Sequence, residues 1–273
     1  MAILPADREY PGSDSDASRL SASERQDRLL KHLNANNFVD IQTFVEELGA
    51  SVSTVRRDLC DLEKRGLLRR THGGAIRVDQ VARDTEAAVR EAINVEEKKR
   101  IGAMAADMIV NGDTVMIDSG TTSRQVALRL AANDSLTFVT NGVDVFATLV
   151  AGGAKNVHFI GGEYIAINRS FGGSMAVEMV HKFNVDKAIL SVMSVDVRRG
   201  FICTLSPQIG CVQQAMIDIA HSVIVVADHS KFGRAALSVI APLEDVDCIV
   251  TDDATRVLLA QASEKIRAKC IFT

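Results

Sequence analysis

Apolar residues between positions 21 and 66 recur three or four places apart, a spacing that predicts three short amphipathic helices. Ser23 can cap the first helix, which ends among residues 34–37, and the second helix stops at Gly49. Either Ser51 or Ser53 can cap the third. The side chains that this spacing turns inward are Leu29, Leu30, Leu33, Ile41, Phe44, Val45, Leu48, Val52, Val55, Leu59 and Leu62.

The third helix ends at Gly66, and a small antiparallel hairpin is predicted directly after it. Residues 67–76 read LLRRTHGGAI, in which Gly73 and Gly74 suit a tight turn. Three short helices followed by a hairpin make a winged helix-turn-helix. We place this domain at residues 21–78.

From residue 96 onward, short apolar segments alternate with segments of helical spacing, which predicts a mostly parallel sheet covered by helices on both faces. This gives a C-terminal α/β domain at residues 96–273. The expected strands are 114–118, 136–140, 157–160, 188–192, 223–227, 248–251 and 269–272, and the expected helices are 96–109, 123–131, 143–150, 175–183, 212–221 and 255–265. Residues 79–95 are polar and rich in Ala and predict a partly helical linker, while residues 1–20 predict a disordered tail.

Composition agrees with two ordinary globular domains. The chain has 273 residues, of which 47% are hydrophobic and only 4% aromatic, a balance that suits helices packed on buried parallel strands. The net charge of -4 argues against a surface that binds nucleic acid all over, but it allows a local basic patch. Five Cys without C-x-x-C spacing, no membrane-spanning run and no signal peptide predict a soluble cytoplasmic protein.

The third predicted helix has the features of a DNA-recognition helix. Its inward residues leave polar and basic side chains outside, where a recognition helix reaches base edges in the major groove. Basic residues on the hairpin can add contacts to phosphates or the minor groove. Charge alone would favour a protein-docking module or a solvated face, but the helix spacing, the serine cap and the paired Arg together favour double-stranded DNA. The candidate DNA-binding residues are Ser53, Thr54, Arg56, Arg57, Arg69, Arg70 and His72.

Small and polar residues lie at the ends of five of the predicted strands. Ser191 is at one of these strand ends. In an open parallel sheet, ligands bind beyond the carboxyl ends of the strands. The sequence DSGTT at 118–122 precedes a helix and offers backbone N–H groups and hydroxyls suited to a phosphate. The alternative is that Asp118 and Asp228 are ordinary helix caps. The candidate effector-binding residues are Asp118, Ser119, Gly120, Thr121, Thr122, Asn141, Gly161, Gly162, Asp228 and Lys231.

Several stretches resemble the DeoR family of bacterial transcriptional regulators, from about residue 21 to the end of the chain. They include VDIQTFVEELGASVSTVRRDLCDLEKRGLLRRTHGGA, EKKRIGAMAADMIVNGDTVMIDSGTT, VTNGVDV, IGGEY and VADHSKFGR; DHSKFGR is most similar to the branch that includes the glycerol-3-phosphate repressor. The resemblance implies a cytoplasmic oligomer that represses a carbohydrate or polyol catabolic operon. It also implies release from the operator when a phosphorylated sugar or polyol binds, and an effector domain similar to ribose-5-phosphate isomerase.

The likeness to an isomerase raises the question of catalysis. Where the family carries a Lys-Arg pair, this chain has Gln213 and Gln214, and residues 209–211 include no carboxylate. Ser191 and Ser194 replace glycines that are usual in the neighbouring motif. The six His lack metal spacing, and GGSMA at 172–176 lacks the last Gly of a nucleophile elbow. We therefore expect no enzyme activity, no cofactor and no metal.

Two alternatives to a ligand-responsive repressor remain open. The first is a sugar-phosphate isomerase or kinase-like enzyme with an accessory DNA-binding domain. The second is a regulator whose α/β domain serves only for oligomerisation. In each case at least a homodimer is expected, because one recognition helix contacts too few base pairs for specificity in a genome.

Overall fold

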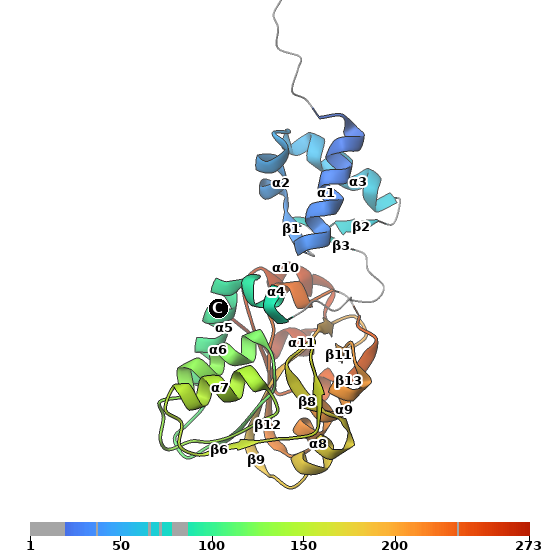
Figure 1. The fold of residues 1–273 in the computed structure, drawn as a ribbon. Coiled ribbons are helices and arrows are strands. Elements are labelled where there is room, and N and C mark those ends of the chain that lie inside the picture. Colours follow the sequence, from blue (N-terminus) through green and yellow to red (C-terminus); the bar gives the residue numbers. More distant parts are fainter. Residues whose placement is uncertain (1–19, 37, 65–66, 71–72, 78–86, 234) are drawn as a thin grey trace, which may run out of the picture.

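The computed structural model describes residues 20–36, 38–64, 67–70, 73–77, 87–233 and 235–273 (Figure 1). All but the last residue of the expected tail 1–20 lies outside the described residues. So do residues 79–86 of the expected linker 79–95 and the candidate residue His72.

The N-terminal domain consists of three helices and a small sheet around a core of its own. Its elements are α1 (Ala22–Asn36), β1 (Phe38–Asp40), α2 (Ile41–Leu48), α3 (Val52–Lys64), β2 (Leu68–Arg70) and β3 (Gly74–Arg77). Phe44, Val55 and Leu62 are fully buried in this core. The predicted hairpin is present as β2 and β3. No pattern in the sequence predicts β1, which pairs antiparallel with the other edge of β3.

Gly74 is required by the pairing of β1 with β3. A Cβ at this position would lie 2.1 Å from the carbonyl oxygen of Val39, a distance that no side chain tolerates. The glycine therefore allows the two strands to approach closely, and it is more than a turn residue.

One helix cap and one expected core residue of this domain differ from the prediction. Ser21, and not Ser23, caps α1: its hydroxyl accepts from the N–H of Glu24 at 3.3 Å, and the Glu24 carboxylate accepts from the Ser21 N–H at 2.9 Å. Ser51 caps α3 through the N–H of Thr54 at 3.2 Å. The expectation that Val52 faces inward is wrong, since its side chain is 39% exposed. As the first residue of α3, it lies before the turn that packs on the core.

The C-terminal domain is built on a seven-stranded parallel sheet, which confirms the α/β fold class. The strands lie in the order β15 (Cys270–Phe272), β14 (Cys248–Thr251), β12 (Ala220–Val226), β9 (Val185–Ser191), β4 (Thr114–Ile117), β5 (Thr137–Thr140) and β6 (Val157–Phe159). The helices that cover it are α5 (Val95–Asp107), α6 (Thr121–Leu130), α7 (Val143–Ala151), α8 (Gly173–Val180) and α9 (Pro207–Asp218).

Side chains along each strand alternate between the two faces of the sheet. In β4, Val115 and Ile117 pack in the cluster that includes residues of α5, α6 and α7. Met116, between them, packs in the cluster with α8 and α9. Figure 1 shows these two groups of helices on opposite sides of the sheet. Both faces are buried, which explains why the central parts of these strands, such as Val115–Ile117 and Val223–Val226, are continuous apolar runs.

Other elements of this domain differ from the prediction or were not predicted. The helix expected at 255–265 is divided into α10 (Thr255–Leu258), the 3₁₀ turn η3 (Leu259–Gln261) and α11 (Glu264–Ala268). A three-stranded antiparallel sheet of β10 (Ser194–Asp196), β11 (Phe201–Thr204) and β13 (Ser238–Pro242) was not predicted, nor was the hairpin of β7 (Glu163–Ile165) and β8 (Ser170–Gly172). Most of these short strands follow one another without a helix between them, so the alternation of strands and helices that predicts the parallel sheet does not reveal them.

The order of the strands contains one reversal. From β4 the chain adds β5 and β6 in one direction, and from β9 it adds β12, β14 and β15 in the other. The strands β4 and β9 are adjacent and parallel at this reversal. Their carboxyl ends therefore border the crevice in which open α/β sheets bind ligands. Of the helices that the structure describes, none combines the length and apolar character needed to cross a membrane.

Candidate functional site

Helix α3 carries an exposed basic surface in its N-terminal half. The side chains of Ser53, Arg56 and Arg57 are exposed, and that of Thr54 is half-buried. Neither Arg forms an ion pair with any other residue that the structure describes. Two uncompensated guanidinium groups on one short helix suit contacts with phosphates or with guanine edges.

Helix α3 is held to α1 by a buried ion pair. The Arg25 Nε atom donates to one carboxylate oxygen of Asp58 at 2.8 Å, and Nη2 donates to the other at 3.3 Å. The Asp58 side chain is 4% exposed and that of Arg25 is 18% exposed. The hydrogen bond to Asp58 raises the pKa of Arg25. This two-point contact fixes the rotation of α3 and hence the direction in which Arg56 and Arg57 point.

Of the candidate residues on the hairpin, Arg69 and Arg70 lie on β2. Arg70 is already engaged, because its Nε donates to Glu63 at 2.8 Å and its backbone N–H donates to the same carboxylate at 2.8 Å. This carboxylate competes with any DNA phosphate for Arg70. Arg70 therefore joins the hairpin to the end of α3, whatever further contact it makes.

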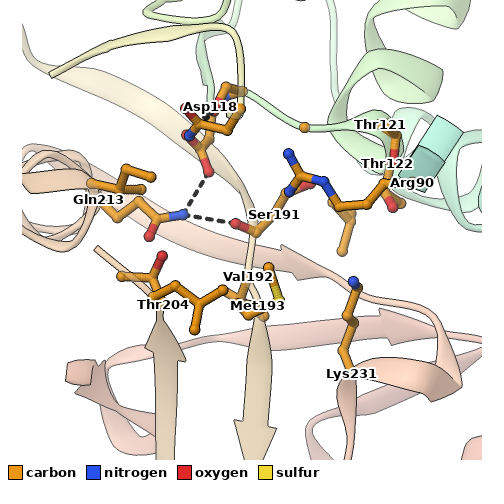
Figure 2. Close-up of a pocket in the computed structure, with 16 residues that line it drawn as sticks. Arg90, Asp118, Thr121, Thr122, Ser191, Val192, Met193, Thr204, Gln213 and Lys231 are labelled. Carbon is orange, nitrogen blue, oxygen red and sulfur yellow. Dashed lines mark hydrogen bonds between the residues drawn. The ribbon is translucent and has the colours of Figure 1, made fainter. Parts of the chain in front are cut away.

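A pocket lies at the carboxyl ends of β4 and β9, with a volume of about 50 Å³ (Figure 2). That space is enough for a few water molecules. The lining combines residues 118–122, which follow β4, with the loop after β9, the start of α9 and the loop after β12. The lining residues are Arg90, Asp118, Ser119, Gly120, Thr121, Thr122, Asn168, Ser191, Val192, Met193, Thr204, Leu205, Ile209, Gln213, Val226 and Lys231.

Asp118 is the buried carboxyl group of this pocket. One of its oxygens accepts from the Ser119 N–H at 2.7 Å, and the other accepts from the Gln213 amide at 2.7 Å. Burial raises the pKa of Asp118 to about 7, and the bonds from Gln213 and Ser119 only partly oppose this increase. Near neutral pH the group is thus present in both protonation states.

Gln213 bridges the two strands at the reversal. Its amide nitrogen donates to Asp118 after β4 and to the backbone carbonyl of Ser191 at the end of β9, both at 2.7 Å (Figure 2). The side chain is 2% exposed, yet its carbonyl oxygen accepts no hydrogen bond from the residues that the structure describes. A buried acceptor that borders a pocket and lacks a donor is a position for a ligand hydroxyl or a water molecule.

The N-terminus of α6 borders the same pocket through Gly120, Thr121 and Thr122. Gly120 precedes this helix with φ of 133°, and a Cβ there would lie 2.7 Å from the side chain of Ser191. Ser191 also accepts from the Ser123 N–H at 3.2 Å. The Thr121 and Thr122 side chains lie beside this helix start (Figure 2). This combination of helix N-terminus, hydroxyls and nearby Lys231 suits an anion.

The structure brings together six of the ten predicted effector residues: Asp118, Ser119, Gly120, Thr121, Thr122 and Lys231. The other four lie outside the pocket lining. Asn141 donates to the Phe171 carbonyl at 3.0 Å, and Gly162, with φ of 144°, lies against the Gly172 backbone. Asn141, Gly162 and the neighbouring Gly161 thus stand where the β7–β8 hairpin joins the sheet.

Asp228 is buried behind Lys231 and does not line the pocket. It caps the 3₁₀ turn η1 (His229–Lys231) by accepting from the Ser230 N–H at 3.0 Å. It also accepts from the Asn94 side chain at 2.9 Å. Burial opposes ionisation, but the charge of Lys231 and the bond from Ser230 prevail and lower the pKa of Asp228. The Asp228 carboxylate therefore holds the turn that carries Lys231, in agreement with the alternative that Asp228 is a helix cap.

Four polar residues that line the pocket were not predicted as site residues: Arg90, Asn168, Thr204 and Gln213. Gln213 lies one position after Val212 on the inward face of α9, so the helical pattern could have placed it near the core. Arg90 lies in the stretch expected to be a linker, and Asn168 lies between two unpredicted strands. Neither of these two has a signal in the sequence pattern.

Comparisons with known proteins match both domains. Residues 25–81 match the DeoR-like helix-turn-helix domain, and residues 93–253 match the DeoR C terminal sensor domain. The chain is similar to the transcriptional repressor AccR of Agrobacterium fabrum, with 47% identity over 92% of this chain and 97% of that protein. It is also similar to the glycerol-3-phosphate regulon repressor of Escherichia coli, with 30% identity over 85% of this chain and 92% of that one.

Among solved structures, ribose 5-phosphate isomerase A from Methanocaldococcus jannaschii aligns with 51% of this chain and 55% of its own, at 13% identity and a TM-score of 0.38. An overlap this low carries no argument about function. The relatives with high coverage are named repressors, which are not enzymes. They confirm the expectation that this chain is a regulator without catalytic activity.

Proposed function

Because the chain belongs to the DeoR family of transcriptional regulators, we propose that it releases its operator DNA when a phosphorylated sugar or polyol binds the pocket between β4 and β9. The chain is a DeoR-type transcriptional repressor with a C-terminal sensor domain. The effector class is supported chiefly by one observation: the N-terminus of α6, two threonine hydroxyls and Lys231 meet at a single pocket.

The arrangement also gives each part of such an effector a partner. The phosphate binds the backbone of residues 119–122 near Lys231. Hydroxyl groups bind Asp118 and the free carbonyl oxygen of Gln213, which together can accept two hydrogen bonds. Because Gln213 is uncharged, it adds no positive charge beside Asp118, and we propose that this side of the pocket contacts the polyol part of the effector.

On the DNA side, we propose that Ser53, Thr54, Arg56 and Arg57 on α3 read the operator in the major groove. The hairpin residues Arg69, Arg70 and His72 would contact the backbone. The separate cores of the two domains support a division into a DNA-binding domain at 21–78, a linker at 79–95 and a sensor domain at 96–273. We also propose that the protein binds DNA as a homodimer or tetramer. Because its proposed target is chromosomal DNA and the relatives described above come from bacteria, we propose that it is located in the cytoplasm.

Calorimetry with a defined panel tests the effector class. The panel is glycerol 3-phosphate, ribose 5-phosphate, glucose 6-phosphate, fructose 1-phosphate and inorganic phosphate. Thr121→Ala and Lys231→Ala should each weaken binding of any panel member that binds the wild type, by tenfold or more for Lys231. Lys155→Ala is a matched control, because Lys155 is 68% exposed and lies before β6 at the amino-terminal ends of the strands, whereas the pocket lies at their carboxyl ends. Equal binding by wild type and both pocket variants would refute the placement of the phosphate.

DNA binding is tested with operator sites that the wild-type protein selects from a random library. Arg56→Ala and Arg57→Ala should each weaken binding by about 1–3 kcal/mol and relax the preference at one base pair. Arg28→Ala, an exposed arginine on α1, serves as the control. A double Arg56→Ala, Arg57→Ala protein that protects its operator normally would refute this assignment.

A further inference from the structure

Helix α4 (Ala87–Ala92) is the first described element after the DNA-binding domain, and it borders the effector pocket. Residues 78–86 connect it to β3 of the winged domain. Arg90 of α4 lines the pocket together with residues of the sensor domain proper (Figure 2). A stretch that the sequence presents as a linker therefore contributes a cation to the ligand site.

One side of α4 is bonded to the loop between β7 and β8. The Ala87 N–H and the Arg90 guanidinium donate to the same acceptor, the carbonyl of Ile167, at 3.2 and 3.0 Å. The next residue, Asn168, lines the pocket and donates to the Ser119 hydroxyl at 3.2 Å. Helix α4 and this loop together cover the start of α6.

The other side and the end of α4 are bonded to elements that carry further pocket residues. Glu91 forms an ion pair with Arg124 of α6. The buried Lys98 ammonium donates to the carbonyls of Arg90 and Ile93, the latter at 2.5 Å. Just beyond α4, Asn94 donates to Asp228 at 2.9 Å, and Asp228 caps the turn that carries Lys231.

Six residues are too few for a helix to be stable alone, so these contacts determine where α4 lies. Apart from the bonds from Lys98 of α5, these contacts end on elements that line the pocket or on the turn of Lys231. A ligand that changes the position of any of these partners therefore also changes the position of α4.

Charge indicates what Arg90 binds. In Figure 2, Arg90 and Lys231 come from different elements and border the same space beside Thr121 and Thr122. Arg90 and Lys231 place two positively charged groups beside the N-terminus of α6, an arrangement that attracts an anionic group. An anionic group held there contacts the sensor domain through Lys231 and the interdomain segment through Arg90.

We propose that Arg90 binds the anionic group of the effector together with Lys231, and that α4 thereby passes the occupancy of the pocket to the segment leading to the DNA-binding domain. This inference rests on the proposed function, since it concerns the same effector. It adds a binding residue, Arg90, and a route from the pocket to the DNA-binding domain. The ligand prefers the position of α4 that disfavours DNA binding. The equilibrium between the two positions of α4 shifts by the difference in the affinity of the ligand for them.

The test uses the full-length protein, the five-compound panel and the selected operator. For any panel compound that binds the wild type, Arg90→Ala should weaken binding at least tenfold, and Arg90→Lys should restore part of the loss by keeping the charge. Arg100→Ala is the matched control: Arg100 lies on α5, is 52% exposed and does not line the pocket. Hydrogen exchange of the amides of residues 87–92 should slow when the compound is added to the wild type.

Each outcome is decisive. If no panel compound binds the wild type, the proposed effector class is wrong and the inference falls with it. If a compound binds the wild type and Arg90→Ala equally well, the effector class stands and the role of Arg90 is refuted. If Arg90→Ala weakens binding but the compound leaves exchange of residues 87–92 unchanged, α4 does not transmit occupancy. Weaker binding together with slowed exchange supports the proposal.

Discussion

The buried carboxyl group of Asp118 should make the stability of the sensor domain fall as the pH rises toward and beyond neutrality. In an unfolded chain its pKa is near 3.8, whereas burial raises the folded-state pKa to about 7. The folded state thus holds a proton that the unfolded state has lost between these two values. Its stabilising contribution is complete below pH 3.8 and is lost as the pH rises through about 7.

The size of the effect follows from the two pKa values. With 3.8 in the unfolded and about 7 in the folded state, the loss between pH 5 and pH 8 is about 2–3 kcal/mol in the free energy of unfolding. Asp118→Asn has the same shape and cannot ionise, so this part of the pH dependence should vanish in that variant. The wild type should therefore lose about 2–3 kcal/mol more than Asp118→Asn over this range.

Urea unfolding followed by circular dichroism at pH 5 and pH 8 measures the difference. Asp134→Asn is a suitable control, because the Asp134 side chain is 58% exposed and does not line the pocket. If wild type and Asp118→Asn respond to pH alike, burial does not dominate the Asp118 carboxyl group. In that case Asp118 would bind the effector hydroxyl groups as a fully ionised carboxylate.

Two further predictions concern the DNA-binding domain. Arg25→Met leaves the Asp58 carboxylate, which is 4% exposed, without its cation and should destabilise this domain by about 3–5 kcal/mol. Thermal unfolding measures this loss, and a loss below about 1 kcal/mol would show that the ion pair does not fix α3. Gly74→Ala places a Cβ 2.1 Å from the Val39 carbonyl and should cost about 1–3 kcal/mol, seen also as faster amide exchange in β1; unchanged exchange would contradict the close strand approach.

The fold could largely be predicted because its main elements are long or buried on both faces. The alternation of apolar strands and amphipathic helices gave all seven strands of the parallel sheet, each within a few residues of its observed position. What escaped prediction depends on contacts distant in sequence. The strand β1 exists because β3 offers it an edge, and the sheet of β10, β11 and β13 includes two strands, β10 and β11, that follow one another without a helix between them.

The site could be predicted as far as strand ends reveal it. The sequence after β4 offered both a turn and a helix start, which identified residues 118–122. It could not show that Asn141 would face the β8 backbone, or that Asp228 would turn toward Asn94, since both depend on which loop packs behind the strand end. Arg90 reaches the pocket only through the packing of α4, which no local pattern encodes.

The most direct test of the account is the affinity for selected operator DNA, measured by fluorescence anisotropy with and without each compound of the panel. A coupling of about 1–3 kcal/mol predicts that one phosphorylated sugar or polyol lowers the affinity by roughly 5- to 150-fold, while inorganic phosphate at the same concentration has a smaller effect. By linkage, saturating operator DNA should weaken binding of that compound by the same factor. Tight operator binding that no panel compound changes would contradict the central claim and leave the α/β domain as an oligomerisation scaffold.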